Sequence, residues 1–249
     1  MRARAVVIAG LAIAVAVSGE ANAAGHKAKP KPKPVPPVCN IVTDSAGDSN
    51  VDLTLGLAPS KMPADANGDI LSADLASDGK FVTAVMRVKS LATPDTAFPE
   101  AHLYMLSWTA PGHSSPVYLA ATVDPNPASA AYGPQFIFGD GASVTAPAIG
   151  PIVSYYNVAS AAVKGTIDAA KNTITLSVPV SAISSYGKFT PGNHFSSIQA
   201  STQALVNGPV LPTNVPDVGG SVGWGFQEDV ADGAKPYVAG TPSCVKPGS

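Results

Sequence analysis

Aspartate and asparagine are concentrated in one stretch near the start of the chain. The members are Asp44, Asp48, Asp52, Asp65, Asn67, Asp69, Asp74 and Asp78. Calcium takes roughly six to eight hard oxygen ligands, and loops rich in Asp, Asn and Gly supply them. The same residue types also form turns at strand ends. The stretch therefore predicts either a calcium site or a set of turns, and we expect Asp44, Asp48 and Asp69 to hold an ion if one binds.

One pattern is typical of serine hydrolases. Residues 219–223 (GGSVG) match G-x-S-x-G, which would make Ser221 a nucleophile. That chemistry needs a strand before the serine, a helix after it and a histidine later in the chain. Residues 212–217 are instead rich in proline, and the last histidine, His194, precedes the serine. We interpret the pattern as a glycine-rich turn and keep a secreted hydrolase, using Ser221 or paired carboxylates, as the alternative.

Three aromatic residues are candidates for binding a sugar. Trp108 and Trp224 are the two tryptophans of the chain, and Tyr104 lies close to the first. An exposed aromatic ring offers an apolar face on which a sugar can stack, whereas an aromatic residue in a strand more often packs in the core. Ligand stacking and core packing are therefore both open for these residues.

The two cysteines, Cys39 and Cys244, lie at the two ends of the segment 39–249. Disulfides persist in exported proteins, and neither cysteine has histidine or cysteine neighbours in the spacing of a metal site. We therefore predict a disulfide between them. A bridge between the ends of this segment predicts one compact domain.

The candidate residues must be positioned by secondary structure, and the sequence predicts mainly short strands. Strands are expected at 81–88, 101–109, 116–123, 132–138, 172–178, 194–203 and 222–227, with one helical turn at 179–186. Asp78-Gly79 is a turn signal before the first strand, and Gly139-Asp140-Gly141 is expected to end the fourth. Many short strands and little helix predict an all-β antiparallel sandwich, of jelly-roll or immunoglobulin-like type. The Gly- and Pro-rich residues 207–220 predict a surface loop.

Two passages resemble known exported domains. Residues 43–48, 68–74 and 77–91 resemble an N-terminal pattern of exported actinobacterial β-sandwich proteins. Residues 174–183 and 190–193, a strand followed by Val-Pro and then Pro-Gly, are similar to a passage of DOMON-like domains and family-nine carbohydrate-binding modules. This resemblance implies a sandwich whose concave face or end loops bind a ligand, often a sugar, sometimes with structural calcium.

The N-terminus has the features of an export signal. Arg2 and Arg4 precede an apolar run over residues 5–17, and Ala21-Asn22-Ala23 offers a cleavage site after Ala23. The run is shorter than the roughly 20 residues that cross a bilayer. Alternating Lys and Pro in residues 27–37 predict a stiff, extended spacer, which either contacts an anionic wall polymer or is simply solvated. We predict a signal peptide at 1–23, a Lys/Pro-rich linker at 24–38, a β-sandwich domain at 39–249 and a secreted mature protein without a membrane span.

The amino-acid composition excludes some classes of protein and disfavours some partners. The chain is 45% hydrophobic and 13% charged, with 23 Gly and 24 Pro, which excludes an extended disordered protein and suits a turn-rich β domain. Six of the 15 basic residues but one of the 17 acidic residues lie in 1–38, so the domain is acidic and nucleic acid is disfavoured as a partner. We expect a secreted, monomeric, non-catalytic binding or surface-associated module. Its expected partner is an extracellular polysaccharide or cell-wall polymer, and a purely structural envelope protein is a further alternative.

Overall fold

The computed structural model describes residues 34–49, 66–91, 102–123, 135–146, 150–157, 160–206, 224–233 and 236–249. The chain divides into two units, residues 1–34 and 35–249, and the described strands belong to the second. Within these described ranges, no helix has the length and apolar character required to cross a membrane.

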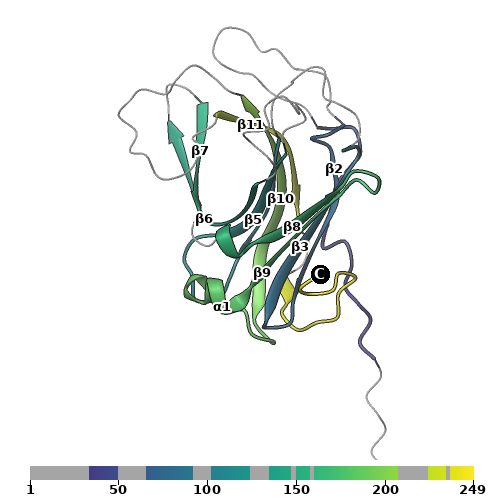
Figure 1. Ribbon diagram of the computed structural model, residues 1–249, viewed down its shortest axis with the longest axis vertical. Coiled ribbons are helices and arrows are strands. Elements are labelled where there is room, and N and C mark those ends of the chain that lie inside the picture. The colour runs from purple at the N-terminus through teal and green to yellow at the C-terminus, as the bar shows by residue number, and fades with distance from the viewer. Residues whose placement is uncertain are drawn as a thin grey trace, which may run out of the picture. The chain divides into compact units, whose positions relative to one another are not determined.

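The described residues form two antiparallel sheets (Figure 1). The strands are β1 (Val42–Thr43), β2 (Ile70–Ser77), β3 (Phe81–Val88), β4 (His102–Thr109), β5 (Val117–Val123), β6 (Gln135–Ala146), β7 (Gly150–Asn157), β8 (Lys164–Asp168), β9 (Thr173–Pro179), β10 (His194–Val206), β11 (Trp224–Asp232) and β12 (Tyr237–Val238). The smaller sheet has the order β1-β2-β3-β9-β8, and the larger has the order β11-β10-β4-β5-β6-β7, with β12 paired to β10. The short helices are α1 (Val180–Ile183), η2 (Ser160–Ala162) and η3 (Ser184–Tyr186). The protein is thus an all-β sandwich, as the strand pattern predicted.

The main core lies between the sheets. Successive side chains of a strand point to opposite faces, so every second residue faces the other sheet. On β4 these residues are Tyr104, Leu106 and Trp108, and on β9 they are Ile174, Leu176 and Val178. All six side chains are buried. Burial of this apolar surface is the main force that holds the sheets face to face.

The larger sheet is also buried on its other face. Leu103, Tyr118, Ala120 and Ile137 form a second buried cluster there, with Met105 beside it. The two edge strands of this sheet, β7 and β11, contact each other, so the sheet is strongly curled. Both faces of β4 and β5 therefore carry buried side chains.

Several sequence expectations are confirmed, but three strands extend beyond their predicted ends: β6 to Ala146, β10 to Val206 and β11 to Asp232. Strand β3 spans the predicted residues 81–88, and Asp78-Gly79 forms the turn between β2 and β3. Gly139-Asp140-Gly141 does not end β6, which continues to Ala146 because these residues pair with β7. The predicted helical turn at 179–186 is formed by α1 and η3. The loop predicted at 207–220 lies outside the described residues.

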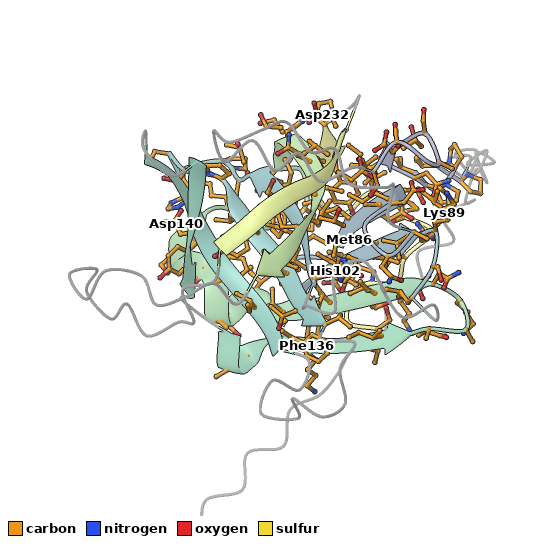
Figure 2. The ribbon with its side chains drawn as sticks, turned by 90° about the horizontal axis from the view of Figure 1, so that it is seen from above. Met86, Lys89, His102, Phe136, Asp140 and Asp232 are labelled. Carbon is orange, nitrogen blue, oxygen red and sulfur yellow. A yellow bond between two sulfur atoms is a disulfide. The ribbon has the colours of Figure 1, made fainter. Side chains whose placement is uncertain are left out.

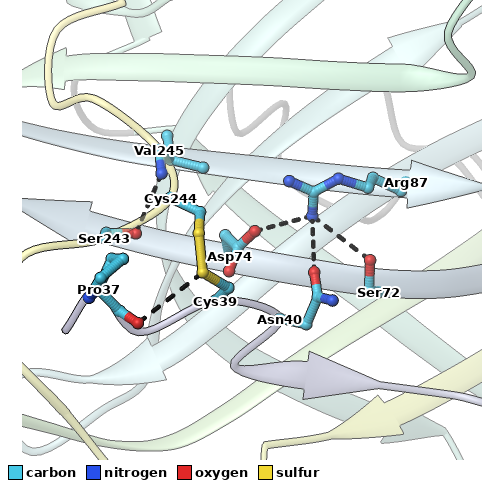
Figure 3. A network of polar contacts seen from close by, with 9 residues as sticks. All are labelled: Pro37, Cys39, Asn40, Ser72, Asp74, Arg87, Ser243, Cys244 and Val245. Carbon is cyan, nitrogen blue, oxygen red and sulfur yellow. Dashed lines mark hydrogen bonds and ion pairs between the residues drawn. A yellow bond between two sulfur atoms is a disulfide. The ribbon is translucent and has the colours of Figure 1, made fainter.

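The ends of the second unit are joined. Cys39 and Cys244 form the predicted disulfide, with their Cα atoms 5.2 Å apart (Figure 3). Beside it, the amide of Val38 donates to the carbonyl of Pro242, and the amide of Cys244 donates to the carbonyl of Val38. The C-terminal segment also closes one end of β2, where the amide of Gly240 donates to the carbonyl of Ser77 at 2.7 Å.

Candidate functional site

Three carboxylates converge at the opposite end of β2 from the C-terminal segment. Asp44, Asp48 and Asp229 each place one oxygen within 4.8 Å of the others. Asp44 follows β1 directly and is half-buried, Asp48 is exposed, and Asp229 in β11 is buried. The group, called the acidic cluster below, therefore draws ligands from both sheets.

The two N-terminal members are placed by a tight turn. The Asp44 amide donates to the Leu71 carbonyl at 3.2 Å, which fixes the start of the turn against β2. Gly47 has φ +94°, a left-handed conformation that glycine adopts without steric cost. Its amide donates to Oδ2 of Asp69 at 2.7 Å. These contacts turn the chain so that Asp48 comes back beside Asp44.

The third member is placed by a bulge in β11. Thr202 pairs with Asp229 whereas Gln203 pairs with Gln227, so Glu228 is an extra residue in the strand. Bulges re-aim side chains and are common beside functional sites. The Asp229 carboxylate reaches β2 of the other sheet, where its Oδ2 accepts the Ile70 amide at 2.8 Å. A second bulge, at Leu71, lies in the facing part of β2, because Ile70 pairs with Val88 but Ser72 pairs with Arg87.

The two sheets are also joined directly at this point. Thr202 of β10 is fully buried, and its hydroxyl donates to the carbonyl of Gly68 at 2.5 Å. Asp229 is 8% exposed. The acidic cluster is therefore built on an inter-sheet junction that ordinary hydrogen bonds already hold in place.

The electrostatics of the cluster favour either a shared proton or a bound cation. Burial raises the pKa of Asp229, and the negative charges of Asp44 and Asp48 raise it further, to about 7, although the Ile70 amide acts in the opposite direction. A hydrogen bond with Asp44 adds to the increase. Like charges this close cannot all remain ionised cheaply in a partly buried place.

The third predicted ligand, Asp69, lies next to the cluster but is not one of its members. Its side chain is fully buried, and its Oδ2 is bound by Lys89 Nζ at 3.0 Å as well as by Gly47. Lys89 marks this end of the molecule in Figure 2. The structure thus brings Asp44 and Asp48 together as predicted, gives Asp69 a supporting role under the turn, and adds Asp229, which the sequence did not suggest.

Two of the three aromatic candidates, Trp108 and Tyr104, are buried and offer no exposed stacking surface. Trp108 is fully buried and packs against Phe195, with ring centroids 6.3 Å apart, and Tyr104 is 1% exposed. Both rings lie on the face of β4 that meets the smaller sheet, which is the physical reason for their burial. Trp224 begins β11, but its side chain lies outside the described part. Core packing is therefore the role that the structure gives to Trp108 and Tyr104.

A second polar group lies elsewhere on the larger sheet. His113 Nε2 lies 3.1 Å from Asp140 Oδ1, and the Tyr186 ring meets the imidazole edge-on. Asp140 and Lys89 lie on opposite sides of the view in Figure 2, so this pair is separate from the acidic cluster. It ties the β4–β5 turn to β6. Ser221, the candidate nucleophile, lies outside the described residues.

Family models and curated proteins give no match to this chain. The chemistry of the acidic cluster therefore rests on its geometry.

Proposed function

We propose that this chain is an exported, non-catalytic β-sandwich that acts as a binding or surface-associated module on a Lys/Pro tether. The observation that carries the proposal is the Cys39–Cys244 bridge, which joins residues 205 apart in sequence. It closes the body where the tether enters, beside Val38 and Pro242. Because the disulfide joins the two ends of the domain, a pull on the N-terminal linker would not separate its first residues from its last.

The position of the acidic cluster supports the same function. β2 runs from Ile70, whose amide binds Asp229, to Ser77, whose carbonyl binds the C-terminal segment. The carboxylates therefore lie at the end of β2 remote from the C-terminal segment. A module displayed in this way would present its acidic end away from its attachment.

The carboxylates support binding more than acid–base catalysis. Asp229 would be the natural general acid, because its pKa is raised to about 7. Its two oxygens, however, already accept the amides of Ile70 and Val230, and the side chain is 8% exposed. A general acid must reach the substrate atom that it protonates. A buried carboxylate tied to two amides suits a binding or structural role better.

The proposed partner is an extracellular polysaccharide or a cell-wall polymer. Because Trp108 and Tyr104 are buried, the contact surface proposed for this partner does not include their rings. The tether supplies a second, electrostatic contact through Lys27, Lys29, Lys31 and Lys33 if the polymer is anionic.

The test is retention of the purified exported protein on insoluble wall and plant polysaccharides. N-terminal sequencing of the exported protein, expected to begin at Ala24, checks the leader. A variant with the four tether lysines replaced by serine separates binding by the tether from binding by the folded body. Retention of the protein supports a binding module, whereas no retention on any polymer favours a purely structural envelope protein. Labelling by a fluorophosphonate that is lost in Ser221→Ala would establish the hydrolase instead.

A further inference from the structure

We propose that Asp44, Asp48 and Asp229 hold a calcium ion that clamps the two sheets together. The inference is independent of the polymer-binding function, since a purely structural protein would need such a clamp equally. Asp44 and Asp48 belong to the connection between β1 and β2 of the smaller sheet, and Asp229 belongs to β11 of the larger sheet. An ion bound to all three would therefore add a further link at a junction where the Ile70 amide binds Asp229 and Val42 forms a β-bridge with Gly233.

Unpaired buried oxygens around the same turn point to a missing ligand. Oδ2 of Asp44, a member of the acidic cluster, is shielded from solvent and has no hydrogen-bond partner. Oδ1 of Asp69, on a fully buried side chain whose other oxygen holds Gly47, is also without a partner. The hydroxyl of Ser49, the fully buried residue after Asp48, is a third such atom. Buried polar atoms are rarely left unpaired in native proteins, and a bound ion is one way in which such oxygens are satisfied.

The charges at this end also favour a bound cation. The acidic cluster brings three carboxylates within 4.8 Å of one another. Lys89, a basic side chain described at this end, is bound to Asp69 at 3.0 Å. Its charge is therefore already matched by a fourth carboxylate. A divalent ion bound among these three carboxylates would neutralise most of their negative charge.

The donor set selects calcium among common divalent ions. Every group in the cluster offers oxygen, whereas zinc prefers nitrogen and sulfur ligands. Magnesium demands near-ideal octahedral geometry, but calcium accepts irregular sets that mix carboxylates, other oxygens and water. The exposure of Asp48 leaves room for water to complete such a set.

The first measurement is calcium titration of the purified exported protein after removal of metal with EDTA. Isothermal calorimetry should show one site in the range of extracellular modules, with saturation below about 10 mM. At about 100 times the dissociation constant, calcium should raise Tm by roughly 5–10 °C, because only the folded state holds the three carboxylates together. Neither heat nor a Tm shift up to about 10 mM calcium would overturn the proposal, and so would a site that takes zinc or magnesium but not calcium.

Two conservative variants and one control assign the ligands. Asp48→Asn should weaken calcium binding at least about tenfold while leaving the EDTA Tm unchanged, because Asp48 is exposed. Asp229→Asn should lose the calcium response, which is measured as the shift from the variant's own EDTA Tm because Asn can accept only one of the two amides that Asp229 accepts. Asp168→Asn changes a carboxylate paired with Lys171 in the β8–β9 turn and should respond to calcium as the wild type does. Wild-type calcium affinity in both cluster variants would refute the assignment.

Hydrogen exchange tests the clamp separately from the binding. Calcium should slow exchange in peptides from both β2 and β11, because the ion links the two strands across the junction. Slowing on one side alone, with binding intact, would mean that the ion belongs to the turn and does not clamp the sheets.

Discussion

The guanidinium of Arg87 lies 2.8 Å from the carboxylate of Asp74, whose side chain is fully buried on the outer side of β2. The same Nη1 lies 3.3 Å from Ser72 Oγ and 3.4 Å from Asn40 Oδ1 (Figure 3). One arginine of β3 thus connects β2 with the segment that follows Cys39. Asp74, one of the predicted acidic turn residues, is instead a structural anion inside a strand.

Replacing Arg87 should destabilise the fold. Arg87→Met keeps most of the side-chain volume but leaves the Asp74 carboxylate buried without its cation. We expect the free energy of unfolding to fall by about 2–4 kcal/mol, toward the low end for a buried pair because the Arg87 side chain is 32% exposed. Urea unfolding followed by circular dichroism measures this change. The double variant Arg87→Met with Asp74→Asn should recover part of the loss, and equal stability of the single variant and the wild type would refute the role of the pair.

Removing the disulfide should lower the free energy of unfolding by more than the Arg87→Met substitution does. The Cys39–Cys244 bridge closes a loop of 205 residues in the unfolded chain. By restricting the unfolded chain, the disulfide stabilises the folded protein by at most about 5 kcal/mol. The Cys39→Ser and Cys244→Ser double variant should therefore unfold at a much lower denaturant concentration than the oxidised wild type. The reduced wild type is the matched control, and it should unfold together with the variant.

The sequence predicted those strands in which burial alternates or in which apolar residues form a clear run. β3 and β9 were found in this way. β2 was not, because its sequence ILSADLAS is buried at nearly every position and contains Asp74 among its polar residues. Its polar side chains suggested turns, whereas Arg87 and the C-terminal segment bury them. Pairing with β7 likewise carried β6 through two glycines that suggested a turn.

The acidic cluster could be predicted only in part. Asp44 and Asp48 share one turn, so their proximity follows from local sequence. Asp229 meets them because the sheets pack, and its contact with Ile70 spans 159 residues. The bulge at Glu228 directs the Asp229 side chain toward β2. This bulge depends on the register between β10 and β11, which no local sequence pattern encodes. The sequence therefore did not predict Asp229 as a ligand, because its position depends on contacts between residues far apart in the chain.

The Thr202 hydroxyl should be needed for the inter-sheet junction. Thr202→Val has nearly the same shape but removes the donor to Gly68, which leaves a buried carbonyl unpaired. We expect a loss of about 1–3 kcal/mol in the free energy of unfolding. Thr166→Val, at an exposed position of β8, is the matched control and should change stability by less than about 0.5 kcal/mol. A loss of the same size in both variants would show that the effect is not specific to the junction.

Stability in metal-free buffer should fall as the pH rises through the range in which Asp229 ionises. The folded-state pKa of Asp229 is raised from 3.8 to about 7, so between these values the folded protein holds a proton that the unfolded chain has lost. A state that binds more protons is favoured at low pH, so this contribution is complete below about pH 4 and is lost by about pH 7. The measurement is Tm between about pH 5 and pH 8 in EDTA for the wild type and Asp229→Asn, because the difference between the two cancels the other titrating groups. The wild type should lose stability relative to the variant as the pH rises, and parallel curves would show that Asp229 does not titrate in this window.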